Sequence, residues 1–184
     1  MMKRFLKRLR PLRHPLWLLA TILFVWWATF GYKYQFIYTD GVSMQPTLHD
    51  GDWIILQKRS TMGKDWKPDR YDVLVIADEN TDEDLSKRVI GTHGDTIEIK
   101  EGEIYLNDRK HKDSFGRGRI FYYLVDDDDN HLYYWGTDEK VVKYPDEQKL
   151  TVPEGYVWII GDNRAESWYG LLPIKDIKGL AVLF

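Results

Sequence analysis

The chain has 184 residues, of which 43% are hydrophobic and 15% aromatic, and it carries a formal net charge of −3. This composition is typical of a folded protein rather than a disordered one. Because the chain has no cysteine, thiol nucleophiles, thiolate zinc sites and a disulfide framework are excluded.

The charge is distributed unevenly. Residues 1–13 contain six basic side chains and no acidic one. The rest of the chain therefore contains 20 of the 26 basic residues and all 29 acidic residues, so it is acidic. An acidic main domain is a poor partner for nucleic acid, because phosphate contacts need clustered lysine and arginine. We therefore expect no nucleic-acid binding, and we expect the basic segment to flank a membrane.

An apolar segment follows the basic one. Leu16–Tyr32 carries no charge, and at about 1.5 Å per residue it spans roughly 26 Å, enough to cross the core of a bilayer. A cleaved signal peptide or a buried core helix is the alternative, but a signal peptide has a shorter apolar run and a small-residue cleavage site. We predict a retained transmembrane anchor over residues 14–33. The positive-inside rule then puts residues 1–13 in the cytoplasm and residues 34–184 on the outer face of the membrane.

The pattern after the anchor is that of β-strands, with no helical periodicity of useful length. Apolar runs and alternating runs predict strands at Trp53–Leu56, Tyr71–Ala77, Thr96–Lys100, Glu103–Asn107, Ile120–Val125, His131–Trp135, Val141–Tyr144, Gly155–Ile160 and Lys178–Phe184. The dipeptide Glu101-Gly102 between two of them predicts a hairpin turn.

Residues from about 105 to 152 are more charged and richer in tyrosine than their surroundings. We predict that they form a small inserted subdomain. Within it, Asp126–Asn130 lacks the spaced ligands and the glutamate of an EF-hand loop, so a solvated turn is expected there rather than a calcium site.

Ser43 is the first candidate for chemistry. Gly41, two residues before it, permits a positive φ, and Pro46 stiffens the exit of the turn. Such a turn can expose the hydroxyl and leave backbone N–H groups free for an oxyanion. A serine near a glycine more often makes only a turn, so this motif alone is weak. Ser43 lies about eleven residues beyond the anchor, and the reach of an extended chain keeps it near the membrane. That position favours a substrate that is itself in the membrane.

Lys87 is the second candidate, at the start of the apolar run Val89-Ile90-Gly91. A buried lysine has a depressed pKa, and its neutral amine can accept the proton of a serine hydroxyl. The commoner alternative is an exposed lysine at a strand edge. The neighbouring Arg88 is expected on the opposite face of the strand.

A third candidate segment, Gly161–Ser167, directly follows an apolar run. Gly161-Asp162-Asn163 predicts a tight turn with side-chain hydrogen bonds to the backbone, and we expect this structural role for Asp162 and Asn163. Ser167 is a candidate for holding the lysine amine in place.

Histidine catalysis is the main chemical alternative. The chain has five histidines, and none lies in the zinc-protease motif H-E-x-x-H. A Ser-His-acid triad that uses His49 or His93 stays open at this point.

The three segments, in this order and after this anchor, resemble the bacterial type I signal peptidases of the S26 family. The resemblance is carried by Ser43-Met44-x-Pro46-Thr47-Leu48 with Gly51-Asp52, by Lys87-Arg88-Val89-Ile90-Gly91 with Gly94-Asp95, by Gly161-Asp162-Asn163-Arg164 with Ser167, and by Gly170, Pro173, Gly179 and Val182. Each motif is weak or moderate alone, whereas three in register are highly specific. The match extends from the anchor to the C-terminus.

The resemblance implies an all-β fold of twisted antiparallel sheets with a small inserted subdomain, behind one N-terminal transmembrane helix. It implies a hydrolase that cleaves signal peptides from secreted preproteins at the outer face of the cytoplasmic membrane. Ser43 would be the nucleophile, Lys87 the general base, Ser167 the residue that orients the lysine, and Met44 part of a shallow pocket for small side chains. The backbone N–H of Ser43 would contribute to the oxyanion hole. No metal and no organic cofactor is implied.

Two departures from the family pattern indicate a divergent member. Gly41 stands where some members carry a hydroxyl residue of the oxyanion hole, so a second donor is unassigned. Tyr169 stands where an acid commonly pairs with the arginine after the catalytic lysine. Arg88 is then expected to pair with Glu166 or to face solvent.

Other classes of protein compete with this prediction. A catalytically silent relative would act as a membrane-anchored assembly chaperone, but such relatives lose the catalytic pair, and this chain keeps Ser43 and Lys87. Self-cleaving Ser-Lys repressors need a DNA-binding domain and no membrane span. A membrane-tethered binding module would require every motif to be accidental.

Overall fold

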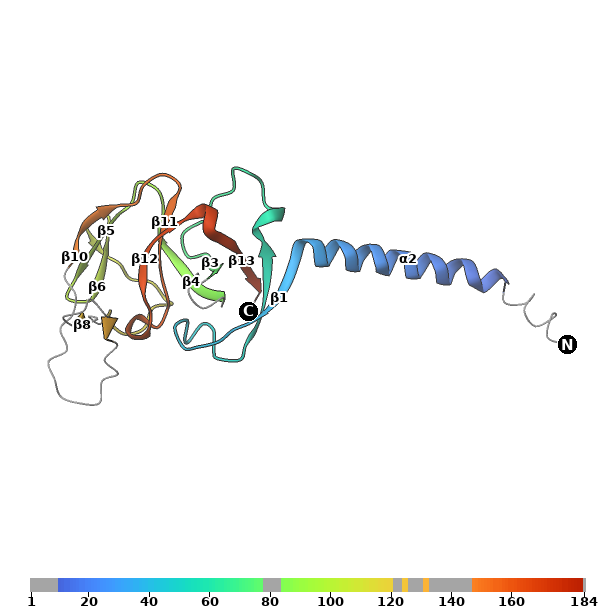
Figure 1. Ribbon diagram of the computed structural model, residues 1–184, viewed down its shortest axis with the longest axis horizontal. Coiled ribbons are helices and arrows are strands. Elements are labelled where there is room, and N and C mark those ends of the chain that lie inside the picture. Colours follow the sequence, from blue (N-terminus) through green and yellow to red (C-terminus); the bar gives the residue numbers. More distant parts are fainter. Residues whose placement is uncertain (1–9, 78–83, 121–123, 126–130, 133–146, 184) are drawn as a thin grey trace. The chain divides into compact units, whose positions relative to one another are not determined.

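The computed structural model describes residues 10–77, 84–120, 124–125, 131–132 and 147–183 (Figure 1). The chain forms two compact units, residues 1–35 and residues 36–184. The first unit is helical and the second is built from antiparallel sheets, so the predicted fold class, β-sheets behind one N-terminal apolar helix, is confirmed.

Helix α2 covers Arg10–Lys33, with Pro15 inside it. Its segment Pro15–Lys33 has a mean hydropathy of 1.4 and is long and apolar enough to cross a membrane. The hydroxyls of Thr21 and Thr29 donate to the carbonyls four residues earlier, at 2.8 and 2.6 Å. These bonds satisfy polar groups that an apolar surrounding would otherwise leave unpaired.

The larger sheet of the second unit has seven strands in the order β1-β2-β13-β3-β4-β11-β12. Its strands are β1 (Tyr34–Tyr38), β2 (Trp53–Lys58), β3 (Val73–Ala77), β4 (Asp84–Gly91), β11 (Tyr156–Ile160), β12 (Tyr169–Pro173) and β13 (Ile177–Leu183). From β2 to β12 every neighbouring pair in this order is antiparallel.

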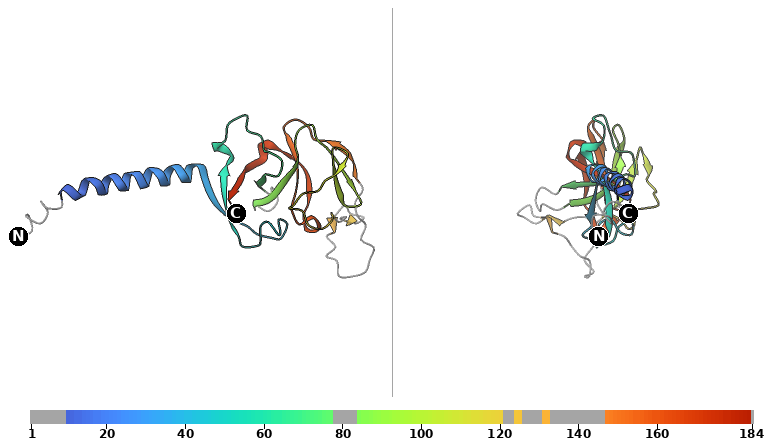
Figure 2. Two further views of the ribbon diagram at one scale, coloured as in Figure 1. Left: turned by 180° about the vertical axis from the view of Figure 1, so that it is seen from behind. Right: turned by 90° about the vertical axis from the view of Figure 1, so that its right-hand side faces the viewer.

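The smaller sheet has the order β10-β5-β6-β7, with β5 (Thr96–Lys100), β6 (Glu103–Leu106), β7 (Arg109–Lys110) and β10 (Glu147–Thr151). It lies beside β11 and β12, at the end of the β unit away from β2 and β13 (Figures 1 and 2). Strand β8 (Leu124–Val125) pairs antiparallel with β9 (His131–Leu132). Three 3₁₀ helices complete the described fold: η1 (Arg59–Thr61), η2 (Arg164–Glu166) and η3 (Ile174–Asp176).

The cores follow from alternation along the strands. On β4 and β11, Ile90, Trp158 and Ile160 face Ile97 and Ile99 of the smaller sheet, so one buried cluster joins the two sheets. Leu74, Val89, Val157, Ile159 and Leu172 form a second cluster on the other side of β3, β4 and β11. Burying both faces makes β4 a rigid support for whatever side chains it presents.

Several strands match the sequence prediction, and the exceptions have physical reasons. Glu101 and Gly102 both have positive φ, 48° and 72°, as the predicted two-residue hairpin turn requires. Strand β4 begins at Asp84, three residues before Lys87, because its polar first half is held by pairing with β3. Strand β12 was missed because Gly170 and Pro173 have weak strand propensity, and pairing with β11 imposes the extended form.

Some predictions fall on residues that are not described. The strand predicted at 141–144 and the turn predicted at 126–130 lie outside the described residues. The smaller sheet begins at Thr96 and ends at Thr151, and the inserted subdomain from about 105 to 152 stays a prediction.

Candidate active site

Ser43 lies in a turn between β1 and β2, half-buried, within the segment 40–51. Thr39 closes this segment at its base, because its N–H donates to the carbonyl of Asp52 at 2.9 Å and its carbonyl accepts from the N–H of Gly51 at 3.0 Å. Gly41 has the positive φ expected of it, 90°, and its N–H donates to Asp50 Oδ1 at 3.0 Å. We call residues 40–51 the serine loop.

Lys87 is the fourth residue of β4, opposite Leu74 of β3. Its side chain is only 2% exposed, so Lys87 points into the protein and is not an exposed lysine at a strand edge. Its Nζ donates to Ser43 Oγ at 2.8 Å. The structure therefore brings the two candidate residues into direct contact across 44 positions of sequence.

Burial governs the charge of this lysine. It lowers the pKa of Lys87 from 10.5 to about 8, with no contribution from a neighbouring charge. For a pKa of about 8, about one-tenth of the amine is neutral at pH 7, and the neutral form can accept a proton. The same Nζ lies over the ring of Trp168, 5.4 Å from the ring centroid.

Ser167 is buried close by, but its hydroxyl is used elsewhere. Its Oγ accepts from the N–H of Gly161 at 2.8 Å and donates to the carbonyl of Trp168 at 2.9 Å. These two bonds are the ones that the described residues make with this hydroxyl, and neither involves Lys87. A direct role of Ser167 in orienting the amine stays a prediction.

The prediction that Arg88 pairs with Glu166 or faces solvent is wrong. Arg88 is 3% exposed and forms two hydrogen bonds with the fully buried carboxylate of Asp162, from Nε and Nη2, both at 2.7 Å. Asp162 comes from the turn after β11, which pairs with β4 in a register that sets Ile160 opposite Arg88. Tyr169 instead packs against Trp158, with ring centroids 5.6 Å apart.

The same turn holds the serine loop. The N–H of Asn163 donates to the carbonyl of Ser43 at 3.0 Å, and Asn163 Nδ2 donates to the carbonyl of Val42 at 3.3 Å. Thr47 donates its hydroxyl to Asp162. Asn163 therefore has the expected structural role on the backbone around Ser43, whereas the carboxylate of Asp162 bonds the side chains of Arg88 and Thr47 instead of the backbone.

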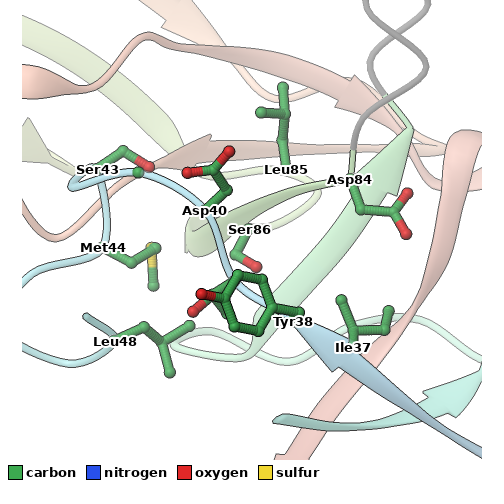
Figure 3. Close-up of a pocket in the computed structure, with 11 residues that line it drawn as sticks. Ile37, Tyr38, Asp40, Ser43, Met44, Leu48, Asp84, Leu85 and Ser86 are labelled. Carbon is green, nitrogen blue, oxygen red and sulfur yellow. The ribbon is translucent and has the colours of Figure 1, made fainter. Parts of the chain in front are cut away.

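A cavity of about 20 Å³ lies next to Ser43, between the serine loop and the first half of β4. Figure 3 shows Met44 and Leu48 on one side of it, Ile37 and Asp84 on the other, and Ser43 at its edge. Met44 is buried and lines this cavity. A space of this size holds about one water molecule, so it suits a methyl group and not a long side chain.

Within the described residues, neither His49 nor His93 forms a hydrogen bond with Ser43 or Lys87. His49 is exposed and sits 3.6 Å from Asp52, and His93 is exposed on the turn before β5. The hydroxyl of Ser43 forms its hydrogen bond with Lys87, which favours the lysine over the histidine alternative. In the described part of the chain no group of three or more His, Asp or Glu is arranged to hold a metal ion.

Comparison with known proteins defines the class of this protein as a peptidase, because the model of one peptidase family matches almost the whole chain. The family described as "Signal peptidase, peptidase S26" matches residues 12–184, and the chain belongs to this family. A signal peptidase I of Streptococcus pneumoniae is 29% identical over 163 residues, which cover 77% of each chain. A signal peptidase I of Bacillus caldolyticus is 34% identical over 144 residues, covering 76% of this chain and 72% of that protein.

A solved structure is also similar. A signal peptidase I from Enterococcus faecalis covers 64% of this chain and 98% of its own, with a TM-score of 0.41 and 21% identity. Membership of the family places this chain among the peptidases. The geometry around Ser43 is taken from the structure of this chain alone.

Proposed function

We propose that this chain is a membrane-bound serine endopeptidase that removes N-terminal signal peptides from exported preproteins, with Ser43 as nucleophile and Lys87 as general base. The observation that supports this most directly is the 2.8 Å contact between Ser43 Oγ and a buried lysine amine. Curated relatives that carry the name signal peptidase I support the substrate class.

The proposed reaction has two halves. Ser43 Oγ attacks the scissile carbonyl carbon while the neutral Nζ of Lys87 takes the hydroxyl proton. The Lys87 ammonium then gives this proton to the leaving amine as the peptide bond breaks, which leaves an acyl ester on Ser43. In the second half Lys87 takes a proton from water, the water oxygen attacks the ester carbon, and the proton returns to Ser43 Oγ.

The negative charge on the substrate oxygen needs donors. The backbone N–H of Ser43 is the donor we propose. The N–H of Gly41 is engaged with Asp50 Oδ1, and glycine has no hydroxyl, so the second donor expected from the family pattern is unassigned. Selection of small residues before the cut follows from the 20 Å³ cavity that Met44 and Leu48 line, since a larger side chain would have to displace packed apolar groups.

Membrane attachment is the remaining part of the proposal. Helix α2 meets the length and hydropathy of a bilayer span over Pro15–Lys33, and six basic residues within residues 1–13 precede this span. We propose that it anchors the chain in the cytoplasmic membrane, with the N-terminus in the cytoplasm and the β unit outside. Catalysis then occurs where a preprotein leaves the bilayer.

The test is cleavage of a preprotein by the full chain in detergent. Ser43→Ala and Lys87→Ala should each lower cleavage by at least about 10³-fold, because each removes a member of one catalytic unit. Lys149→Ala, which changes an exposed lysine of β10, should cleave like the wild type. Circular dichroism checks that each variant keeps its β content.

Cleavage that survives Lys87→Ala would exclude this lysine as the base, and His49 and His93 would then be the residues to test. A wild-type chain that binds preproteins but never cleaves them would favour the catalytically silent alternative.

A further inference from the structure

Lys87 has few partners for its amine. The ammonium carries three protons, and the described residues provide one hydrogen-bond acceptor, Ser43 Oγ. No carboxylate contributes to its pKa. The other close group is the indole of Trp168, whose ring lies under Nζ at 5.4 Å. A distance below about 6 Å is within the range of an attractive cation–π contact.

The hydroxyl of Ser167 bonds the backbone of the residue that carries this indole, and it does not bond the amine. It accepts from the N–H of Gly161 and donates to the carbonyl of Trp168, so it fixes the backbone that carries the ring. A bond from Ser167 to its neighbour's carbonyl uses the only proton that the hydroxyl has. Ser167 is therefore placed to act on Lys87 through Trp168.

The indole also packs on the hydrophobic core. Trp168 is half-buried and packs on the cluster formed by β3, β4 and β11, which contains Leu74, the residue opposite Lys87 on β3. The ring thus has one set of contacts with a rigid core and another with the amine. An aromatic side chain loses little conformational freedom on ordering, which suits it to a positioning role.

We infer that Trp168 is a positioning residue for Lys87: its ring covers the amine, excludes water from it and holds Nζ on Ser43 Oγ, while Ser167 fixes the ring. The inference rests on the proposed function in naming Lys87 as the general base. It adds a residue that the family pattern does not assign, and it gives the Ser167 hydroxyl a different target.

Two effects of the ring on the amine oppose each other. A cation–π contact favours the ammonium, whereas exclusion of water disfavours it. Burial lowers the pKa of Lys87 to about 8, and we expect the exclusion of water to be the larger of the two effects. Ser43 from the serine loop and the ring of Trp168 from the segment before β12 contact Nζ, and Leu74 lies opposite Lys87 on β3. The neighbouring Arg88 is neutralised by Asp162.

The experiment compares Trp168→Ala and Trp168→Phe with Trp66→Ala in the full chain in detergent. Trp66 packs on the same cluster but lies over Arg59 instead of Lys87, so it is a matched control for lost packing. We expect Trp168→Ala to move the midpoint of the kcat–pH profile up by about one unit, because water then reaches the amine. At pH 7 kcat falls accordingly and KM changes little. Trp168→Phe keeps a ring, and its midpoint stays close to that of the wild type.

A second readout does not need catalysis. A carbon-13 NMR titration of lysine Cε, with the Lys87 signal identified by its loss in Lys87→Ala, should show the same upward shift in Trp168→Ala. An unchanged or lowered Lys87 midpoint in folded Trp168→Ala, or an equal shift in Trp66→Ala, would overturn the inference. If Trp168→Ala fails to fold, Trp168→Leu replaces it. We then expect the Lys87 midpoint to shift upward, and an unchanged midpoint would overturn the inference. If the wild type cleaves no preprotein, the proposed function fails, and the NMR titration still decides the role of Trp168.

Discussion

In the proposed mechanism the chemistry of this site depends on a single lysine. Lys87 is surrounded by apolar groups and by a serine hydroxyl, with its nearest cationic neighbour, Arg88, paired on the other face of the strand. Desolvation therefore acts on it without a compensating carboxylate, and its pKa falls to about 8. A lysine at an exposed strand edge would keep a pKa near 10.4 and would be protonated at neutral pH.

The lowered pKa of Lys87 predicts how cleavage depends on pH. Below a pH of about 8 the Lys87 amine is mostly protonated and cannot take the Ser43 proton, so cleavage should rise with pH and level off above about 8. The measurement is kcat/KM for a preprotein from pH 6 to pH 10 in the wild type, with Lys149→Ala as a control that keeps the same midpoint. A midpoint near 10 would contradict a buried, partly neutral lysine.

At the scale of elements, the turn between β11 and η2 organises the site. It supplies Asp162 to Arg88, Asn163 to the backbone around Ser43, and Gly161 to Ser167. One short turn thus connects the lysine strand β4 with the serine loop. Its close approach to that loop needs glycine, because a Cβ on Gly161 would lie 2.2 Å from the carbonyl oxygen of Ser43 and 2.5 Å from Ser167 Oγ.

This contact predicts a specific defect in Gly161→Ala. The added methyl group must push the serine loop away from the turn, which lengthens the distance from Ser43 to Lys87. A displacement of about 1 Å at a reacting atom lowers the rate by about 10²-fold, so kcat/KM should fall by that order. Gly63→Ala is the matched control, because its Cβ would meet no atom within 4 Å. A Gly161→Ala enzyme with wild-type cleavage would show that the serine loop moves freely relative to this turn.

At the scale of the whole molecule, the chain combines an apolar helix with an antiparallel β unit that buries its own core. Because the described residues of the β unit include a seven-stranded and a four-stranded sheet with several buried clusters, we expect it to fold without the helix. The helix would then serve to concentrate the enzyme on the membrane surface, which raises the effective concentration of a membrane-bound substrate.

Removal of residues 1–33 separates these roles. We expect the shortened chain to cleave a short peptide substrate in solution at close to the rate of the full chain. Cleavage of a preprotein inserted in lipid vesicles should fall by at least about tenfold, because the effective concentration is lost. Sedimentation with vesicles checks that the shortened chain leaves the membrane fraction. Equal cleavage of the vesicle-bound preprotein by both chains would mean that helix α2 is not what brings the enzyme to its substrate.

The sequence by itself determined the apolar helix, the hairpin at Glu101-Gly102 and the two residues, Ser43 and Lys87, that the structure brings together. These features are local, since they depend on hydrophobic periodicity, on turn residues and on short motifs. Only the tertiary structure decided that Arg88 pairs with Asp162, that Ser167 bonds the backbone of its neighbour, and that the ring of Trp168 covers the lysine amine. These contacts join segments separated by up to 81 positions, as Lys87 and Trp168 are, and they depend on strand register and side-chain direction, which no local pattern encodes.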